Sequence, residues 1–175
     1  MLTKKSLRFL ILIPALLLGV SACTTFGTVA EDSSIEGRIK DRINPILEKN
    51  KPTAVDVVSH NLYVLIYGQV PNEDVIVQIS NSIKGVPEMK KAFNELRIGN
   101  PENVSTASDV WITTKVKSSL AAEKGLDSKR IKVITEDKEV FLMGMVTREE
   151  GDKAALVARN ISGVKKVVKI FEYID

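Results

Sequence analysis

Few side chains in this chain of 175 residues could carry out covalent or metal chemistry. The sequence has one cysteine, Cys23, and one histidine, His60, together with adjacent acids such as Glu149 and Glu150. A thiol can act as a nucleophile, an imidazole can bind metal or transfer protons, and paired carboxylates can divide acid and base roles. Each of these groups also has a purely structural interpretation, and the surrounding sequence decides between the two.

His60 lies in the polar segment 59–61, which predicts a solvated turn rather than a metal ligand. Glu149 and Glu150 follow Thr147, so we expect them in the first turn of a helix, where the dipole favours anions, and not as a catalytic pair. Without a cluster of histidines and cysteines the sequence offers no structural zinc site. We therefore expect a non-enzymatic protein with no catalytic residue, no metal, no cofactor and no small-molecule substrate.

Cys23 stands behind a basic start, an apolar stretch over 9–18 and a few small residues. This is the layout of a secretory signal, and the stretch is shorter than the about 20 residues that span a bilayer. Val-Ser-Ala-Cys at 20–23 resembles the lipobox of bacterial lipoproteins, which implies a signal peptide over 1–22 and a palmitate-bearing anchor at Cys23. The alternatives are an ordinary cleaved signal with a leftover cysteine and a catalytic thiol, although nothing near Cys23 would activate a thiol.

The residue after the lipidated position, Thr24, is not aspartate. By resemblance to the sorting rule of Gram-negative lipoproteins, this implies delivery to the outer membrane. Removal of residues 1–22 takes away Lys4, Lys5 and Arg8, so the formal net charge falls from +3 to zero. The mature chain therefore has no overall charge that favours nucleic acid.

From Asp32 onward the sequence contains the same pattern of residues twice. VDVVSHNLYVLIYGQV at 55–70 aligns with IKVITEDKEVFLMGMV at 131–146, and IKGV at 83–86 aligns with ISGV at 161–164. Self-similarity over this length indicates two copies of one structural unit. The expected parts are a lipidated, extended tether at 23–31, a first domain at 32–98, a linker at 99–108 and a second domain at 109–175.

The elements are clearest in the second copy. Ile112, Val116 and Leu120 recur every four residues and predict one face of a helix, with Asp109 as its N-cap. Alternating apolar residues on both sides of an acidic turn at 136–138 predict a hairpin of two half-buried strands.

A second helix is expected after Thr147, with its C-terminal cap at Gly163, and a third strand is expected over 167–174. Each copy therefore has the order α-β-β-α-β. The fold class is α+β, with two such units in tandem, each a three-stranded mixed sheet with two helices packed on it. Gly68 and Gly144 fall inside expected strands, which indicates a bulge or a close approach by a helix.

Two units of this order, with VFLMGMV at 140–146 and ISGVKKVVKIF at 161–171, resemble BON domains, a bacterial module. With the lipobox they resemble dual-BON outer-membrane lipoproteins over essentially the whole mature chain. The resemblance implies a lipid-anchored protein at the periplasmic face of the outer membrane that binds anionic phospholipids through its second BON domain and supports envelope integrity. The first helix of that domain carries the lipid contact in the family, and DVWITTKVK at 109–117 stands at its place.

Trp111 is the only tryptophan of the chain. At 100° per residue it lies about 140° from the centre of its helix's apolar face, so it should point away from the core. A tryptophan among small polar residues and lysines suits a membrane interface, where the ring lies at headgroup depth and the lysines meet phosphates. The expected phospholipid-binding residues are Trp111, Thr114, Lys115, Lys117 and Ser118.

Two other interpretations of Trp111 stay open at this stage. The ring could pack against the first domain or the linker at 99–108, or it could bind a protein. The alternative function is accordingly a protein-interaction adaptor or chaperone-like module of the envelope assembly machinery. The partner is an anionic phospholipid membrane in the first case and an envelope protein in the second, and it is not nucleic acid in either.

Overall fold

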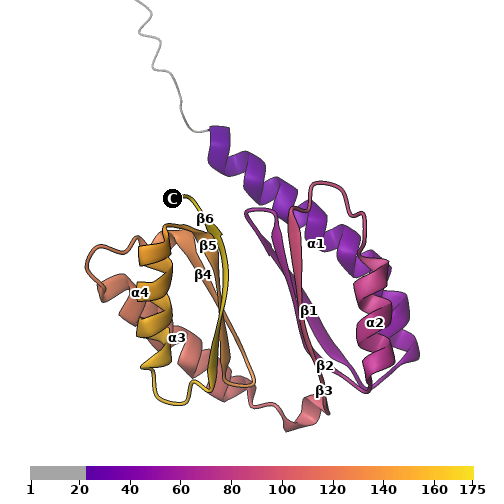
Figure 1. Ribbon diagram of the computed structural model, residues 1–175. Coiled ribbons are helices and arrows are strands. Elements are labelled where there is room, and N and C mark those ends of the chain that lie inside the picture. The colour runs from indigo at the N-terminus through magenta and orange to yellow at the C-terminus, as the bar shows by residue number, and fades with distance from the viewer. Residues whose placement is uncertain (1–22) are drawn as a thin grey trace, which may run out of the picture.

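A computed structural model describes residues 23–175, with side chains described from residue 28, so the expected signal peptide at 1–22 lies outside the described residues. The chain forms two α-β-β-α-β units in the predicted order (Figure 1). The elements are α1 (Cys23–Lys49), β1 (Ala54–His60), β2 (Tyr63–Val70), α2 (Glu73–Ser82) and β3 (Lys91–Ile98) in domain 1, then α3 (Thr106–Ala122), β4 (Ile131–Glu136), β5 (Glu139–Val146), α4 (Arg148–Arg159) and β6 (Lys166–Tyr173) in domain 2.

Each domain has a mixed three-stranded sheet, which confirms the α+β fold class. The orders are β1-β2-β3 and β4-β5-β6, with an antiparallel first pair and a parallel second pair in both sheets. Two-residue turns close the hairpins at Asn61-Leu62 and at Asp137-Lys138, and all four residues have positive φ. Such turns match the right-handed twist of the strands that they join.

The two helices of each domain cover one face of its own sheet and bury a separate core. In domain 1 the core includes Ile35, Ile39 and Ile43 of α1, which are fully or almost fully buried. In domain 2 the predicted face of α3 is buried in the same way. Those residues are Ile112, Val116 and Leu120, each 0–1% exposed.

The opposite faces of the two sheets pack against each other, which the sequence did not predict. Leu65, Phe141, Met143 and Ile170 are buried there, and Tyr67 contacts Phe141 with ring centres 6.1 Å apart. The molecule therefore has four layers, with the helices of domain 1, its sheet, the sheet of domain 2 and the helices of domain 2 in turn (Figure 1). The expectation of a half-buried hairpin was wrong for β5, which is buried on both faces.

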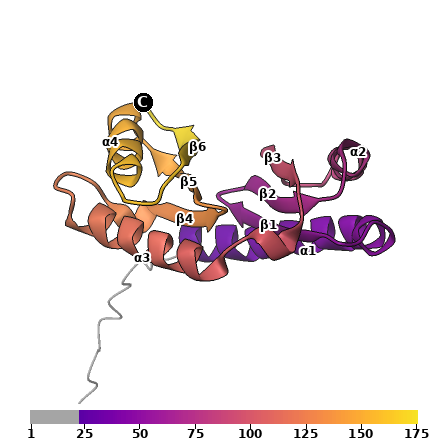
Figure 2. The ribbon, with the colours of Figure 1, turned by 90° about the horizontal axis from the view of Figure 1, so that it is seen from below.

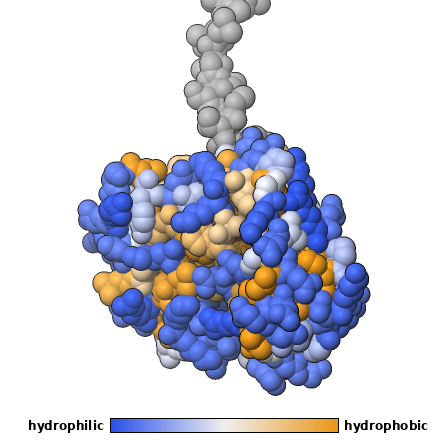
Figure 3. Space-filling view, turned by 45° about the vertical axis from the view of Figure 1, so that its right-hand side comes forward, coloured by the Kyte–Doolittle hydropathy of each residue, from blue (hydrophilic) through white to orange (hydrophobic). Residues whose placement is uncertain are grey.

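Polar contacts close the two ends of this interface. Lys90 Nζ lies 2.9 Å from Glu172 Oε1 at one end, and Arg97 pairs with Glu139 at the other. The face seen in Figure 3 is mainly hydrophilic, with apolar patches between hydrophilic side chains.

The N-cap of α3 is Ser105, whose hydroxyl accepts from Ser108 N, so the prediction of Asp109 as the cap was wrong. Asp109 is instead buried one turn into the helix, where its carboxylate accepts hydrogen bonds from Asp137 N at 2.8 Å and Lys138 N at 2.9 Å. It holds the hairpin turn against the helix. α3 consequently begins within the segment expected to be linker.

The segment expected to be an extended tether forms the first turns of α1, which runs without interruption from Cys23. A helix that is already nucleated by packing gains one hydrogen bond for each residue added, and residues 23–31 contain no proline that would stop it. Domain 1 is therefore joined to Cys23 by helix rather than by an extended tether.

Gly68 and Gly144 lie where two strands approach closely. They have φ of +122° and +159°, and a Cβ would collide with the carbonyl oxygens of Ala54 and Arg130. Ala54 is the first residue of β1, and Arg130 ends the 3-10 helix η2 (Ser128–Arg130) directly before β4. The close approach is therefore made by backbone at the start of the neighbouring strand and not by a packed α-helix.

Candidate membrane-binding face

The outward face of α3 differs from that of an ordinary surface helix. Its exposed residues are mostly small or apolar, whereas amphipathic helices place charged groups on the outside. Val110 is 61% exposed and Trp111 is 48% exposed. The exposed residues of this face are Ala107, Val110, Trp111, Thr114, Lys115, Lys117, Ser118, Ala121 and Ala122.

Trp111 points away from the core, as its position on the helix predicts. Lys115 Nζ lies 5.8 Å from the centre of the indole ring, a cation–π distance that holds the ammonium beside the ring. The cluster of side chains between the two sheets does not include Trp111. The tryptophan therefore keeps about half of its surface available to a partner outside the chain.

Lys115, Lys117 and Ser118 are all exposed. Around the helix Lys115 and Ser118 lie within about 40° of Trp111, and Lys117 lies about 120° away, on the edge near Val110. Neither lysine forms a salt bridge in the described part of the chain, so both ammonium groups are available to anions. The hydroxyl of Thr114 donates to Val110 O at 2.9 Å, and its oxygen remains able to accept. The five predicted residues are thus all exposed on α3, and together with Val110 they make up what we call the α3 face, with Lys115 and Lys117 at its two edges.

The basic residues that follow α3 in the sequence differ from Lys115 and Lys117 in their contacts. Arg130 lies 3.6 Å from a carboxylate oxygen of Glu150, and Lys132 Nζ lies 3.5 Å from Ser59 O of domain 1. Lys129 stays exposed and lines a cavity of about 290 Å³ with Lys117. A cationic extension of the α3 face therefore runs through Lys117 and Lys129.

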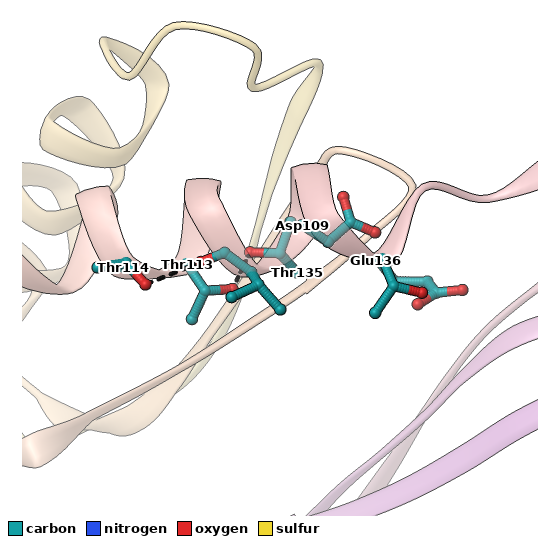
Figure 4. A pocket seen from close by; sticks show the side chains of 7 residues that line it. Asp109, Thr113, Thr114, Thr135 and Glu136 are labelled. Carbon is teal, nitrogen blue, oxygen red and sulfur yellow. Dashed lines mark hydrogen bonds between the residues drawn. The ribbon is translucent and has the colours of Figure 1, made fainter.

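A second cavity, of about 230 Å³, opens on the other half of the same flank of α3. Thr113 donates to the hydroxyl of Thr135 at 2.8 Å across it (Figure 4). The sequence pattern did not predict this cavity, although several of its threonines lie in the segment TASDVWITT at 106–114. Its lining is Thr106, Asp109, Val110, Thr113, Thr114, Thr135 and Glu136.

Glu136 joins this cavity to the domain interface. Its carboxylate accepts from Gln69 Nε2 of domain 1 at 3.0 Å. Burial raises the pKa of Glu136 above its usual value, the hydrogen bond from Gln69 opposes that shift, and the charge of Asp109 adds to it. Gln69 is only 5% exposed, and its Oε1 has no hydrogen-bond partner in the described part of the chain.

His60 is not the solvated turn residue that the sequence predicted. It ends β1, and the domain interface covers its ring, leaving Nε2 buried without a partner among the described residues. Burial lowers the pKa of His60, and the charge of Lys132 lowers it further, whereas Asp32 and a backbone hydrogen bond with Arg130 act in the opposite direction. The sequence held no signal for this, because the covering residues come from the other domain.

Glu149 and Glu150 occupy the first turn of α4, as predicted. Thr147 is the N-cap, and Glu150 completes a capping box by accepting from Thr147 N at 2.8 Å. Within residues 23–175 no group of histidine, cysteine, aspartate and glutamate is arranged to hold a metal ion. No helix of that part of the chain is long and apolar enough to cross a bilayer.

Comparison with known proteins identifies a domain family and several similar proteins. The BON domain model matches residues 31–100 and 108–175. Over 152 residues the chain is 38% identical to the outer membrane lipoprotein DolP of Haemophilus influenzae, covering 86% of this chain and 79% of that protein.

Two further relatives cover similar shares of the chain. Identity is 36% to the 21 kDa hemolysin of Actinobacillus pleuropneumoniae, covering 85% of this chain and 77% of that protein. Identity is 26% to the osmotically inducible protein Y of Escherichia coli, and the alignment covers 84% of this chain and 75% of that protein. Each of these alignments, over 150 to 152 residues, is longer than either BON match and therefore includes residues of both domains of this chain.

Proposed function

The chain belongs to the BON-domain family, with two BON domains in tandem, and we propose that it is a non-enzymatic, lipid-anchored protein of the outer membrane. Cys23 carries the anchor in this proposal, and the folded part lies on the periplasmic side. The lipobox-like motif at 20–23 and the 38% identity to an outer membrane lipoprotein support it. Two or more acyl chains are needed for stable attachment, and lipidated cysteines carry them.

The α3 face is the proposed contact with anionic phospholipids, and this contact supports the integrity of the outer membrane. The observation that carries the proposal is the half-exposed ring of Trp111 with Lys115 beside it. Lys117 is exposed on the same helix, and neither lysine has a carboxylate partner among the described residues. An indole at headgroup depth and lysines at the phosphates are the usual pairing at a membrane surface. Each lysine contributes about 1 kcal/mol near an anionic surface.

The arrangement of the helices is compatible with a single membrane surface. In Figure 2, α1 and α3 lie along one side of the molecule, and α2 and α4 lie toward the other. α1 begins at Cys23, so the side that carries the anchor is also the side of α3. Two weak attachments on one body reinforce each other through effective concentration, and the α3 face can therefore bind weakly on its own.

The test uses the chain from residue 24 onward, without the anchor, and vesicles of neutral lipid with or without phosphatidylglycerol. We expect the emission of Trp111 to shift to the blue only with anionic vesicles, and added salt should weaken the shift. Co-sedimentation extends the test to Trp111→Glu and to Lys115→Glu with Lys117→Glu, all of which should lose binding. Lys84→Glu reverses one charge beyond the end of α2 and should bind normally.

An unchanged spectrum together with no sedimentation in the anionic vesicles would reject the phospholipid contact. The adjacent exposed side chains of Val110 and Trp111 would then favour the second candidate, an adaptor that docks an envelope protein on the same face. In that case a photo-crosslinker at position 110 should capture one defined envelope protein, and capture should be lost in Trp111→Glu.

A further inference from the structure

Two cavities meet at Glu136, at one end of the contact between the two sheets. Glu136 lines both the cavity of about 230 Å³ beside α3 and a cavity of about 310 Å³ over β1 and β2. Its side chain extends from the end of β4 toward the strands of domain 1 (Figure 4). Each volume exceeds the roughly 30 Å³ that one water occupies in the liquid, so a group of several heavy atoms has room. We call the two cavities together the Glu136 site.

The lining of the Glu136 site contains carboxylates and no cation. Neither cavity is lined by a lysine or an arginine. Asp56 in the lining is paired with Lys40 at 3.0 Å, whereas Glu136 and Asp109 have no salt-bridge partner among the described residues. The site therefore carries negative charge that the described part of the chain does not neutralise.

Glu136 keeps one carboxylate oxygen available to a ligand. Oε1 accepts from Gln69 Nε2 at 3.0 Å, and Oε2 has no hydrogen-bond partner among the described residues. Burial raises the pKa of Glu136, and the charge of Asp109 adds to this shift against the hydrogen bond from Gln69. Arg97 opposes the shift only weakly, and it is itself paired with Glu139. A cation at Oε2 would relieve this excess of negative charge.

A buried neutral group at the same place also lacks a donor. Gln69 is 5% exposed, and Oε1 of the amide that bonds Glu136 has no partner among the described residues. Thr113 has used its hydroxyl proton on Thr135, so its oxygen only accepts. A buried acceptor without a partner loses solvation energy that a donor would restore. Ammonium and guanidinium groups donate several hydrogen bonds and accept none, so they match this excess of acceptors.

The duplication makes the two ends of the interface equivalent. His60 aligns with Glu136, and Arg130 aligns with Ala54. His60 forms a hydrogen bond with the backbone of Arg130, and Glu136 lines a cavity with Ala54. Each of the two residues therefore lies against the start of the first strand of the other domain.

At the end that holds His60, the chain supplies its own cation. Lys132 Nζ of domain 2 reaches across the interface to Ser59 O at 3.5 Å. The position that aligns with Lys132 is Asp56, which lines the Glu136 site. The strand position that carries a lysine at one end thus carries a carboxylate at the other, and the cavity there is open.

We infer that the Glu136 site binds a lysine or arginine side chain of a partner protein. The inference goes beyond the proposed phospholipid contact and does not depend on it. The cationic group lies at Glu136 Oε2, and its aliphatic stem lies against Val110. A zwitterionic lipid joins its ammonium to a phosphate through a short ethyl link, so it would bring an anion beside Glu136 and Asp109. A protein side chain brings the cation without an attached anion, which favours a protein partner.

The test is a nuclear magnetic resonance titration of the isotope-labelled chain from residue 24. The probes are short, end-capped glycine–alanine peptides with one central lysine or one central arginine. We expect both peptides to shift the side-chain amide signals of Gln69 and the backbone signal of Thr135, with a Kd of about 1–10 mM. The same peptide with an acetylated lysine should leave these signals unchanged, because acetylation removes the charge.

Glu136→Gln removes the charge and keeps an acceptor for Gln69, so the fold should be retained. This variant should weaken both peptides at least about tenfold, the effect of losing hydrogen bonds to a charged group. Its binding to anionic vesicles should not weaken. Glu149→Gln removes an exposed carboxylate of α4 and should bind both peptides as the original chain does. The dispersion of the spectra establishes that both variants are folded.

Three results would overturn the inference: no shifts at peptide concentrations tenfold above the expected Kd, equal shifts with the acetylated peptide, or unchanged affinity in Glu136→Gln. O-phosphoethanolamine tests a lipid source of the cation. If it shifts the signals of Gln69 and Thr135 at lower concentrations than the peptides do, the site takes a zwitterionic headgroup and the protein assignment is overturned. Vesicle sedimentation tests the contact of α3 with phospholipid separately, so failure of one proposal is distinguishable from failure of the other.

Discussion

At the scale of single residues, the same residue types serve different purposes at positions that look alike in the sequence. Asp109 and Thr147 both precede an apolar helical pattern, but only Thr147 is a cap. Trp111 and Phe141 are both aromatic, but one is half-exposed and the other is buried between the sheets. Burial and partners, rather than residue type, therefore decide each role.

The first prediction concerns Gly68, where a side chain has no room. Gly68→Ala places a Cβ against the carbonyl of Ala54 at a positive φ, and we expect a loss of at least about 2 kcal/mol in the free energy of unfolding. Urea denaturation followed by circular dichroism measures it. Gly37→Ala is the matched control, since that glycine lies in α1 with open space around it, and it should gain about 0.5–1 kcal/mol. A neutral Gly68→Ala would contradict the close approach.

At the scale of elements, both domains use one device to join the first helix to the hairpin. Asp32 of α1 accepts from Asn61 N and Leu62 N at 2.9 Å, as Asp109 of α3 does from the equivalent turn. Two turn N–H groups that could pair with nothing else in the hairpin are thereby satisfied. The aspartate that aligns in the two copies is therefore a latch between helix and turn.

The second prediction tests this latch. Asp109→Ala leaves two partly buried N–H groups without an acceptor, and we expect the free energy of unfolding to fall by roughly 1–3 kcal/mol. Asp109→Asn keeps one acceptor oxygen and should cost less. Asp41→Ala, at an exposed position on α1, is the control and should stay within about 0.5 kcal/mol of the original. Equal values for Asp109→Ala and Asp41→Ala would show that the turn is held by other contacts.

At the scale of the whole molecule, the sheet-to-sheet contact makes one body from two domains. Its centre is apolar, and lysines, arginines and glutamates close its ends. The α3 face and the N-terminal end of α1 consequently keep a constant relation, which a flexible joint would not maintain. A protein held at two points on one membrane benefits from that rigidity.

The third prediction tests the coupling of the domains. Phe141 is almost fully buried between the sheets, so Phe141→Ala should cost about 3–5 kcal/mol and separate one cooperative thermal transition into two. Differential scanning calorimetry measures the transitions. Val77→Ala, on the exposed side of α2, should leave a single transition. Two transitions in the unaltered chain would contradict a coupled interface.

The fourth prediction concerns pH and His60. The pKa of His60 is lowered from 6.5 because burial and Lys132 disfavour the imidazolium, so the folded state binds its proton less readily than the unfolded state. The contribution of the neutral imidazole to the free energy of unfolding is fully present above about pH 6.5. It is lost as the pH falls below that value, by at most about 1.4 kcal/mol per pH unit. Melting temperatures between about pH 7.5 and 5.5 should therefore fall with acidity. His60→Gln should flatten the dependence, and an equal slope in that variant would assign it to other groups.

The sequence by itself determined the order of elements, the duplication and the direction of Trp111. These follow from local physics: apolar residues spaced by four predict a helical face, and alternation around an acidic turn predicts a hairpin. Asp137 and Lys138 form the predicted turn, and Ile112, Val116 and Leu120 form the predicted buried face. The likeness of the two copies was likewise sufficient for the fold class.

Only the tertiary structure decided which faces meet across the two domains. The continuous apolar runs of β2 and β5 were compatible with burial on one face or on both, and the second sheet supplies the cover that makes it both. Gln69 contacts Glu136, and His60 lies beside Lys132, so both acquire partners from more than 60 positions away in the sequence. Local periodicity carries no information about contacts at that separation, because burial between domains depends on where the other sheet packs.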